Sequence, residues 1–145
     1  MAKEALVKVL PTSKYLVVTD TLTDEMIKVG EAVVRKLDAL HFKVDAALWF
    51  YSPEDRGWRL LIANPEVNTG GPLKAYKKIR SAIEKITDAP KKIDLIDISV
   101  LDSSARLISL FKEAIKPEKA IGGVRFSRSA IHTTFIEDAY IYRLA

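Results

Sequence analysis

The sequence predicts an α+β fold, with a mixed or mostly antiparallel sheet of about five strands and three helices packed on it. Two aromatic-rich apolar runs flank a short break in mid-chain, which is typical of a β-hairpin. Apolar residues recur at helical spacing in three other segments. The expected order is α-β-β-α-β-α-β-β, and it lacks the strict alternation of a purely parallel fold.

The hairpin is expected over residues 44–63, with residues 53–57 as a five-residue loop. A register that pairs Phe50 with Leu60 collects an almost unbroken apolar surface on one face of the hairpin. The opposite face is too apolar to face water alone and too polar for an ordinary core. The residues of this second face that we select as an interface are Asp45, Trp49, Tyr51 and Arg59.

The first third of the chain precedes this hairpin. Residues 1–20 suit an N-terminal arm or an edge strand. Either Thr21 or Thr23 is a suitable N-cap for a helix that continues to about Leu40. Gly30 lies inside this helix, where glycine is unfavourable, so we expect the helix to pack closely on the sheet there.

The second half supplies two more helices and three more strands. Pro72 suits the first position of a helix that ends near Thr87. We expect a strand over residues 93–101, a helix from Asp102 or Ser103 to Ile115, and strands over residues 124–131 and 135–143. The path from the first of these strands through the helix to the second fits a right-handed parallel crossover.

Composition excludes several classes of protein. The 145 residues suit one globular domain spanning residues 1–145, and 48% hydrophobic with 29% charged residues is an ordinary globular balance. The absence of cysteine excludes disulfides, thiolate metal sites and thiol nucleophiles, and it fits a reducing compartment. No apolar stretch approaches the roughly 18 residues that span a bilayer. We therefore expect a cytoplasmic protein without a membrane partner.

A search for catalytic motifs finds none of the common nucleotide-binding, zinc-protease, serine-hydrolase or calcium-binding patterns. The order of segments invites comparison with metal-dependent nucleases, and Asp45 is the candidate leading acid. However, no lysine has an acidic residue two positions before it. His41 and His132, with Asp45 or Asp138, are the remaining candidates for a metal site, but two unrelated histidines are the simpler interpretation. We expect no catalytic residue, metal or cofactor.

The net charge of +4 is unevenly distributed. Basic residues outnumber acidic ones between Lys74 and Lys92, where phosphate groups are a suitable partner. A solvated helix face explains the same pattern and is the simpler interpretation. The candidate residues for binding an anion or a nucleic acid are Lys74, Lys77, Lys78, Arg80, Lys85, Arg125 and Arg128.

The functional hypothesis is a small binding or protein-interaction domain that self-associates through the aromatic hairpin face. Tryptophan, tyrosine and arginine dominate interface hot spots, and the chosen register places Tyr51 opposite Arg59 for a cation–π contact. Tyr140 and Tyr142 are expected to extend this surface. The first alternative is a nucleic-acid-binding module that uses the basic helix over residues 73–87. An enzyme of unknown chemistry, similar to a metal-dependent phosphodiesterase, is the last alternative.

Overall fold

The computed structural model describes residues 14–145, which form one five-stranded sheet with helices on both faces. The strands are β1 (Ala46–Ser52), β2 (Gly57–Asn64), β3 (Ile98–Asp102), β4 (Val124–Ile131) and β5 (Thr134–Leu144). The helices are α2 (Asp24–Ala39), α3 (Val67–Gly70), α4 (Pro72–Glu84) and α5 (Arg106–Ala114), with a 3-10 turn η1 (Leu95–Asp97). The predicted α+β class is confirmed, and the order of elements matches apart from the short α3 and η1.

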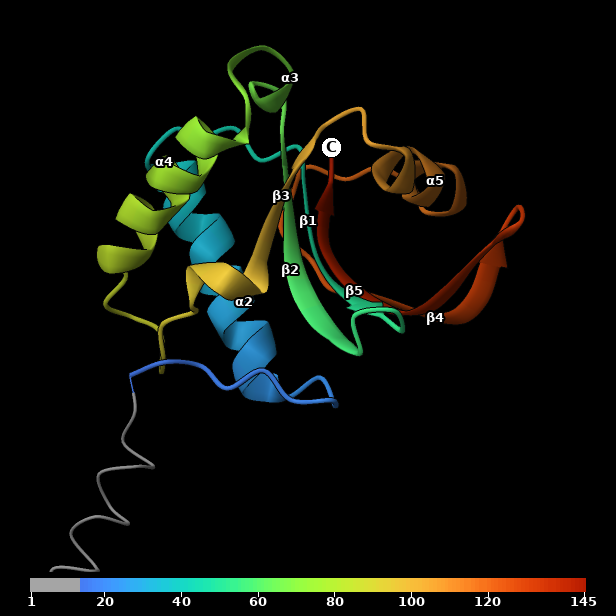
Figure 1. Ribbon diagram of the computed structural model, residues 1–145, viewed down its shortest axis with the longest axis horizontal. Helices are drawn as coiled ribbons and strands as arrows, with labels where there is room; N and C mark the ends of the chain where they lie inside the picture. The colour runs from blue at the N-terminus through green and yellow to red at the C-terminus, as the bar shows by residue number, and fades with distance from the viewer. Residues whose placement is uncertain (1–13) are drawn as a thin grey trace, which may run out of the picture.

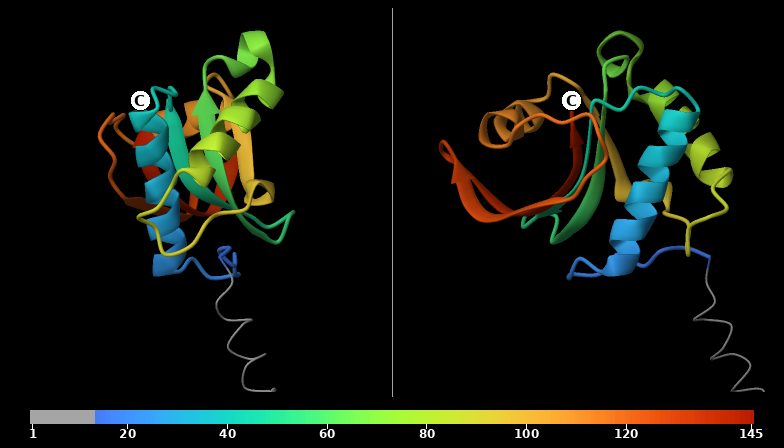
Figure 2. Two further views of the ribbon diagram at one scale, coloured as in Figure 1. Left: turned by 90° about the vertical axis from the view of Figure 1, so that its left-hand side faces the viewer. Right: turned by 180° about the vertical axis from the view of Figure 1, so that it is seen from behind.

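The sheet has the strand order β3-β2-β1-β5-β4, in which β2 and β3 are parallel and the other neighbours are antiparallel. Helices α2 and α4 cover one face and α5 covers the other (Figure 1). The view from behind shows the same three layers (Figure 2). Because the central strands are buried on both faces, β1 and β2 are apolar along most of their length. In the described part of the chain, no helix is long and apolar enough to cross a membrane.

The predicted hairpin register is wrong by one residue. Phe50 lies opposite Arg59 rather than Leu60, and the loop between the paired ends holds four residues rather than five. Because side chains alternate between the faces of a strand, a shift of one residue changes which side chains share a face. Tyr51 therefore lies opposite Trp58, and the predicted pairing of Tyr51 with Arg59 does not form.

The strand predicted over residues 93–101 is also shorter than expected, because β3 begins only at Ile98. The Asp94 side chain accepts a hydrogen bond from the Ile96 N–H, and the Asp97 N–H donates to the Asp94 carbonyl. These bonds close the η1 turn where the strand was expected. The predicted parallel crossover between this strand and β4 is wrong, since β3 and β4 lie at opposite edges of the sheet and run in opposite directions.

The predicted N-terminal arm or edge strand falls mainly on residues 1–13, which lie outside the described residues. Tyr15 forms an isolated parallel bridge with Lys92. Helix α2 then begins after Thr23, whose hydroxyl accepts a hydrogen bond from the Met26 N–H at 3.1 Å. Thr23, one of the two predicted N-caps, is therefore confirmed.

Gly30 allows α2 to pack closely on the sheet. A Cβ atom at this position would lie 2.3 Å from Tyr142 Oη and 2.7 Å from Trp49 Nε1. Both of these side chains form hydrogen bonds with the helix backbone. The Trp49 indole N–H donates to the Met26 carbonyl at 3.0 Å, and the Tyr142 hydroxyl donates to the Ile27 carbonyl at 2.6 Å. The close packing predicted from Gly30 is confirmed.

Candidate functional site

The four residues of the predicted aromatic interface do not share one surface. Trp49 is 0% exposed, and its indole N–H donates to the Met26 carbonyl and to Tyr142 Oη within the layer between α2 and the sheet. Tyr142 is buried beside it, so burial raises the pKa of its hydroxyl. The expectation that Trp49 belongs to an exposed face is therefore wrong, and Tyr142 does not extend such a face.

The other three residues of the set lie in separate places. Arg59 donates from Nε to Ser99 Oγ at 2.6 Å and from Nη2 to the Ile98 carbonyl at 3.1 Å. Tyr51 is half-buried and stacks edge-on against Trp58, with ring centroids 5.5 Å apart. Asp45 precedes the opposite end of β1 and lies 3.9 Å from Lys43. A single docking surface cannot contain all of them.

A cation–π contact does form on this hairpin, with different partners. The Arg125 guanidinium lies 5.8 Å from the centroid of the Trp58 ring. Asp138 holds Arg125 in place through two hydrogen bonds of 2.5 and 2.6 Å, and this hydrogen bonding raises the pKa of Arg125. Arg125 therefore links β4 to Asp138 on β5 and to Trp58 on β2.

The predicted basic residues form two groups rather than one surface. Helix α4 and the segment after it carry Lys74, Lys77, Lys78, Arg80 and Lys85, and β4 carries Arg125 and Arg128. Helix α4 and β4 lie at opposite sides of the molecule (Figure 1). In the first group, Lys78 lies 3.5 Å from Glu66 and Arg80 lies 3.8 Å from Glu84. A nucleic acid on α4 would therefore not also contact Arg125.

The histidines do not form a common metal site. His132 Nε2 lies 3.0 Å from a carboxylate oxygen of Glu113 on α5. His41 follows α2 and adopts φ 60°. Residues 14–145 contain no group of three or more His, Cys, Asp or Glu side chains placed to hold a metal ion.

The two edge strands of the sheet, β3 and β4, differ in the contacts of their backbone groups. At the β3 edge, the Val100 N–H donates to Tyr76 Oη at 3.0 Å, and the Ile98 carbonyl accepts from Arg59. Side chains therefore occupy backbone groups of β3. Strand β4 pairs with β5, and among the described residues no other strand pairs with it. Of the eight residues of β4, only Ile131 is buried.

Strands β4 and β5 also extend beyond the rest of the sheet. Residues 134–136 of β5 pair with β4 but not with β1, and this ribbon curves beneath α5 (Figure 1). Phe126 and Ile131 both pack in the α5-side core although they are five residues apart in one strand. The alternation of side chains between the two faces of β4 is therefore interrupted between these two residues. Arg128, with φ 48°, is the residue of this strand that departs from extended geometry. Arg128 thus divides the free edge into residues 124–127 and residues 129–131, both of which pair with β5.

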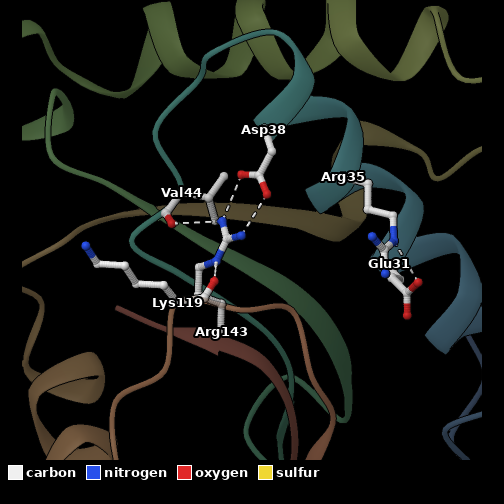
Figure 3. Close-up of polar contacts among 6 residues, drawn as sticks. All are labelled: Glu31, Arg35, Asp38, Val44, Lys119 and Arg143. Atoms are coloured by element: carbon white, nitrogen blue, oxygen red, sulfur yellow. Dashed lines mark hydrogen bonds and ion pairs between the residues drawn. The ribbon is translucent and has the colours of Figure 1, made fainter.

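A polar cluster lies at the far end of the sheet, around Arg143 at the end of β5 (Figure 3). Its side chain is 11% exposed and makes two hydrogen bonds to the Asp38 carboxylate, at 2.7 and 2.8 Å. It also donates to the Lys119 carbonyl at 2.6 Å and to the Val44 carbonyl at 3.3 Å. Hydrogen bonding to Asp38 raises the pKa of Arg143. Four chain segments therefore meet at one guanidinium.

This cluster was missed in the sequence because Asp38 and Arg143 are 105 residues apart and belong to no motif. Comparisons with protein-family models, with curated proteins and with solved structures gave no match.

Proposed function

We propose that this protein is an interaction domain that associates with a second copy of itself by pairing the free edge of β4. The supporting observation is the difference between the two edges of the sheet. Side chains of other elements, Tyr76 and Arg59, occupy backbone groups of β3, whereas on β4 a side chain of the same strand, Ser129, occupies the Ser127 carbonyl, and no other described strand pairs with its outer row. Such an edge is a template for another strand. The proposal includes a cytoplasmic location, supported by the absence of cysteine.

An antiparallel arrangement about a twofold axis would use the same residues from both copies. Residues 124–127 form the longer of the two segments of β4 that Arg128, with φ 48°, separates. Pairing of these segments would join two five-stranded sheets into one. Val124 is 43% exposed and would lose accessible apolar surface on pairing. Self-association is thus assigned to the C-terminal strands rather than to the aromatic hairpin.

The test is sedimentation equilibrium of the native protein and of a Ser127→Lys variant. The Ser127 side chain is exposed and makes no hydrogen bond to a described residue, so the substitution is compatible with the folded chain. Lysine on an edge strand opposes strand pairing. We expect a dimer for the native protein at tens of micromolar, and association about tenfold weaker or more for the variant.

The matched control is Ser81→Lys, which makes the same change at an exposed position on α4, on the other side of the molecule. This control should dimerise like the native protein. A native protein that stays monomeric at hundreds of micromolar would contradict self-association. Equal dimerisation of Ser127→Lys and Ser81→Lys would place the interface somewhere other than β4.

A second candidate is nucleic-acid binding by α4. Lys74 and Lys77 are exposed on this helix and form no ion pair with a described residue. Each phosphate contact would make binding weaken with salt. In a fluorescence-anisotropy titration with a single-stranded oligonucleotide, Lys77→Glu/Lys78→Glu should abolish salt-dependent binding, while Lys112→Glu/Lys116→Glu near α5 should retain most of it. Equal binding by both double variants would exclude α4 as the contact.

A further inference from the structure

Arg128 interrupts β4 near the middle of the strand. Its φ of 48° lies in the left-handed region, which residues other than glycine adopt only rarely. The pairs that join β4 to β5 pass from Ser127 with Asp138 directly to Ser129 with Ile136. The strand therefore keeps the same partner on both sides of Arg128 but is irregular at this one residue.

Packing on the two sides of this residue shows the extent of the irregularity. Phe126 and Ile131 both pack in the α5-side core, although residues five apart in a regular strand face opposite sides. The partner strand changes face over the same stretch, since Ile136 and Ala139 also both pack in that core. The two strands turn over together, so the outer edge of β4 changes direction at this point.

A hydrogen bond across Arg128 supports the bend. The Ser129 hydroxyl donates to the Ser127 carbonyl at 3.1 Å and so joins the two residues that flank Arg128. The Arg128 side chain is exposed and makes no hydrogen bond or ion pair with a described residue. The left-handed conformation is therefore not imposed by a contact of this side chain.

The segment beyond the bend is the shorter of the two. It holds residues 129–131 and ends at the hairpin turn, where His132 also has a left-handed φ of 55°. Strand pairing is stabilised by the side-chain pairs that it brings together, so this short segment between two irregular positions offers less than residues 124–127. Val124, which is 43% exposed, adds accessible apolar surface to the longer segment.

We propose that the bend at Arg128 confines the pairing of a second copy to residues 124–127 and excludes residues 129–131 from the interface. This inference rests on the proposed function, the pairing of two copies through β4. One partner strand can follow either segment of the edge, but the change of direction between them prevents it from following both. Only a few cross-strand pairs then contribute, which keeps the association reversible. An irregularity that turns part of an edge strand away also limits uncontrolled pairing.

The test places the same charge on either side of the bend. Ser127→Lys and Ala130→Lys both put a lysine at an exposed position of β4, and lysine on an edge strand opposes pairing. In sedimentation equilibrium, we expect Ser127→Lys to weaken dimerisation about tenfold and Ala130→Lys to leave it nearly unchanged. Hydrogen exchange of the native chain, followed by NMR, is the second readout. As concentration rises, outer amides of residues 124–127 should become protected and those of residues 129–131 should not.

Equal weakening by the two lysine variants, or protection of residues 129–131, would show that the pairing passes the bend. Either result would overturn this inference and leave the proposed function intact. Weakening by Ala130→Lys alone would overturn it as well, because the pairing would then use the other segment. Dimerisation that neither variant affects would contradict the proposed function, and this inference with it. The exchange measurement uses the native chain, so it decides the question even where a variant fails to fold.

Discussion

Gly30 determines how α2 meets the sheet. The absence of a side chain there lets the Trp49 indole and the Tyr142 hydroxyl reach the backbone of the first turn of the helix. These polar atoms are buried, and each makes a hydrogen bond, so the layer between helix and sheet satisfies its polar groups without water. One small residue in mid-helix thus makes room for two large aromatic side chains.

The substitution Gly30→Ala tests this interpretation. Its Cβ would overlap Tyr142 Oη and Trp49 Nε1, and both rings would have to move. Overpacking of this kind costs about 1–3 kcal/mol in the free energy of unfolding. Urea denaturation followed by circular dichroism measures this loss.

Gly70→Ala is the control for this substitution, because a Cβ at that position would have no atom within 4 Å. Its stability should stay within about 0.5 kcal/mol of the native value, since alanine is the better helix former. Similar losses in the two variants would mean that the space beside Gly30 has no special role.

Local signals of this type were readable in the sequence. Thr23 before a run of helical spacing and Pro72 at a helix start act through neighbouring backbone, and Gly30 stands out because glycine is unfavourable inside a helix, although the side chains it makes room for lie on distant strands. The partners of Arg143 and Arg125 were not readable, because ion pairs between distant segments depend on how the strands are ordered. A candidate site built from such pairs has no sequence signature.

Among the elements, α2 and β5 are joined by the Asp38–Arg143 pair. Figure 3 also shows the exposed pair of Glu31 and Arg35 on the same helix, which provides a natural comparison. The side chain of Arg143 is 11% exposed, whereas that of Arg35 is 61% exposed. Ion pairs gain more where water is excluded, so the two pairs should differ in their effect on stability.

We expect Asp38→Asn to lower the free energy of unfolding by about 1–2 kcal/mol, because the half-buried Arg143 would lose the carboxylate to which it makes two hydrogen bonds. Glu31→Gln should lower it by less than about 0.5 kcal/mol. Both changes replace a carboxylate on α2 with an amide of nearly equal size. If thermal and urea denaturation give equal losses for the two variants, Arg143 does not have the structural role described here.

For the hairpin of β1 and β2, the sequence predicts that the hairpin forms but does not determine its register. Two apolar runs around a turn were sufficient to predict the hairpin. The register was not predictable, because Leu60, Leu61 and Ile62 are all apolar and all buried. A strand covered on both faces has no polar side to fix its alternation, so a shift of one residue leaves the pattern equally plausible.

At the scale of the whole molecule, the two edges of the sheet differ in which side chains occupy their backbone groups, those of α4 and β2 at β3 and that of Ser129 in the same strand at β4. If two copies pair through β4, amide hydrogens on the outer side of β4 should exchange more slowly as protein concentration rises, while those of β3 should be unaffected. Hydrogen exchange followed by mass spectrometry over a dilution series provides this second readout for the same variants. A uniform change along the chain would instead indicate a general gain in stability.

The fluorescence of both tryptophans is expected to change when the segment at the start of α2 detaches from the sheet. The Trp49 indole donates to the Met26 carbonyl and the Trp58 indole donates to the Asp20 carbonyl, so each ring is attached to the segment where α2 begins. Detachment of that segment would expose two buried chromophores to water together. Intrinsic fluorescence, without any added dye, therefore monitors the seating of this helix in every variant that retains both rings.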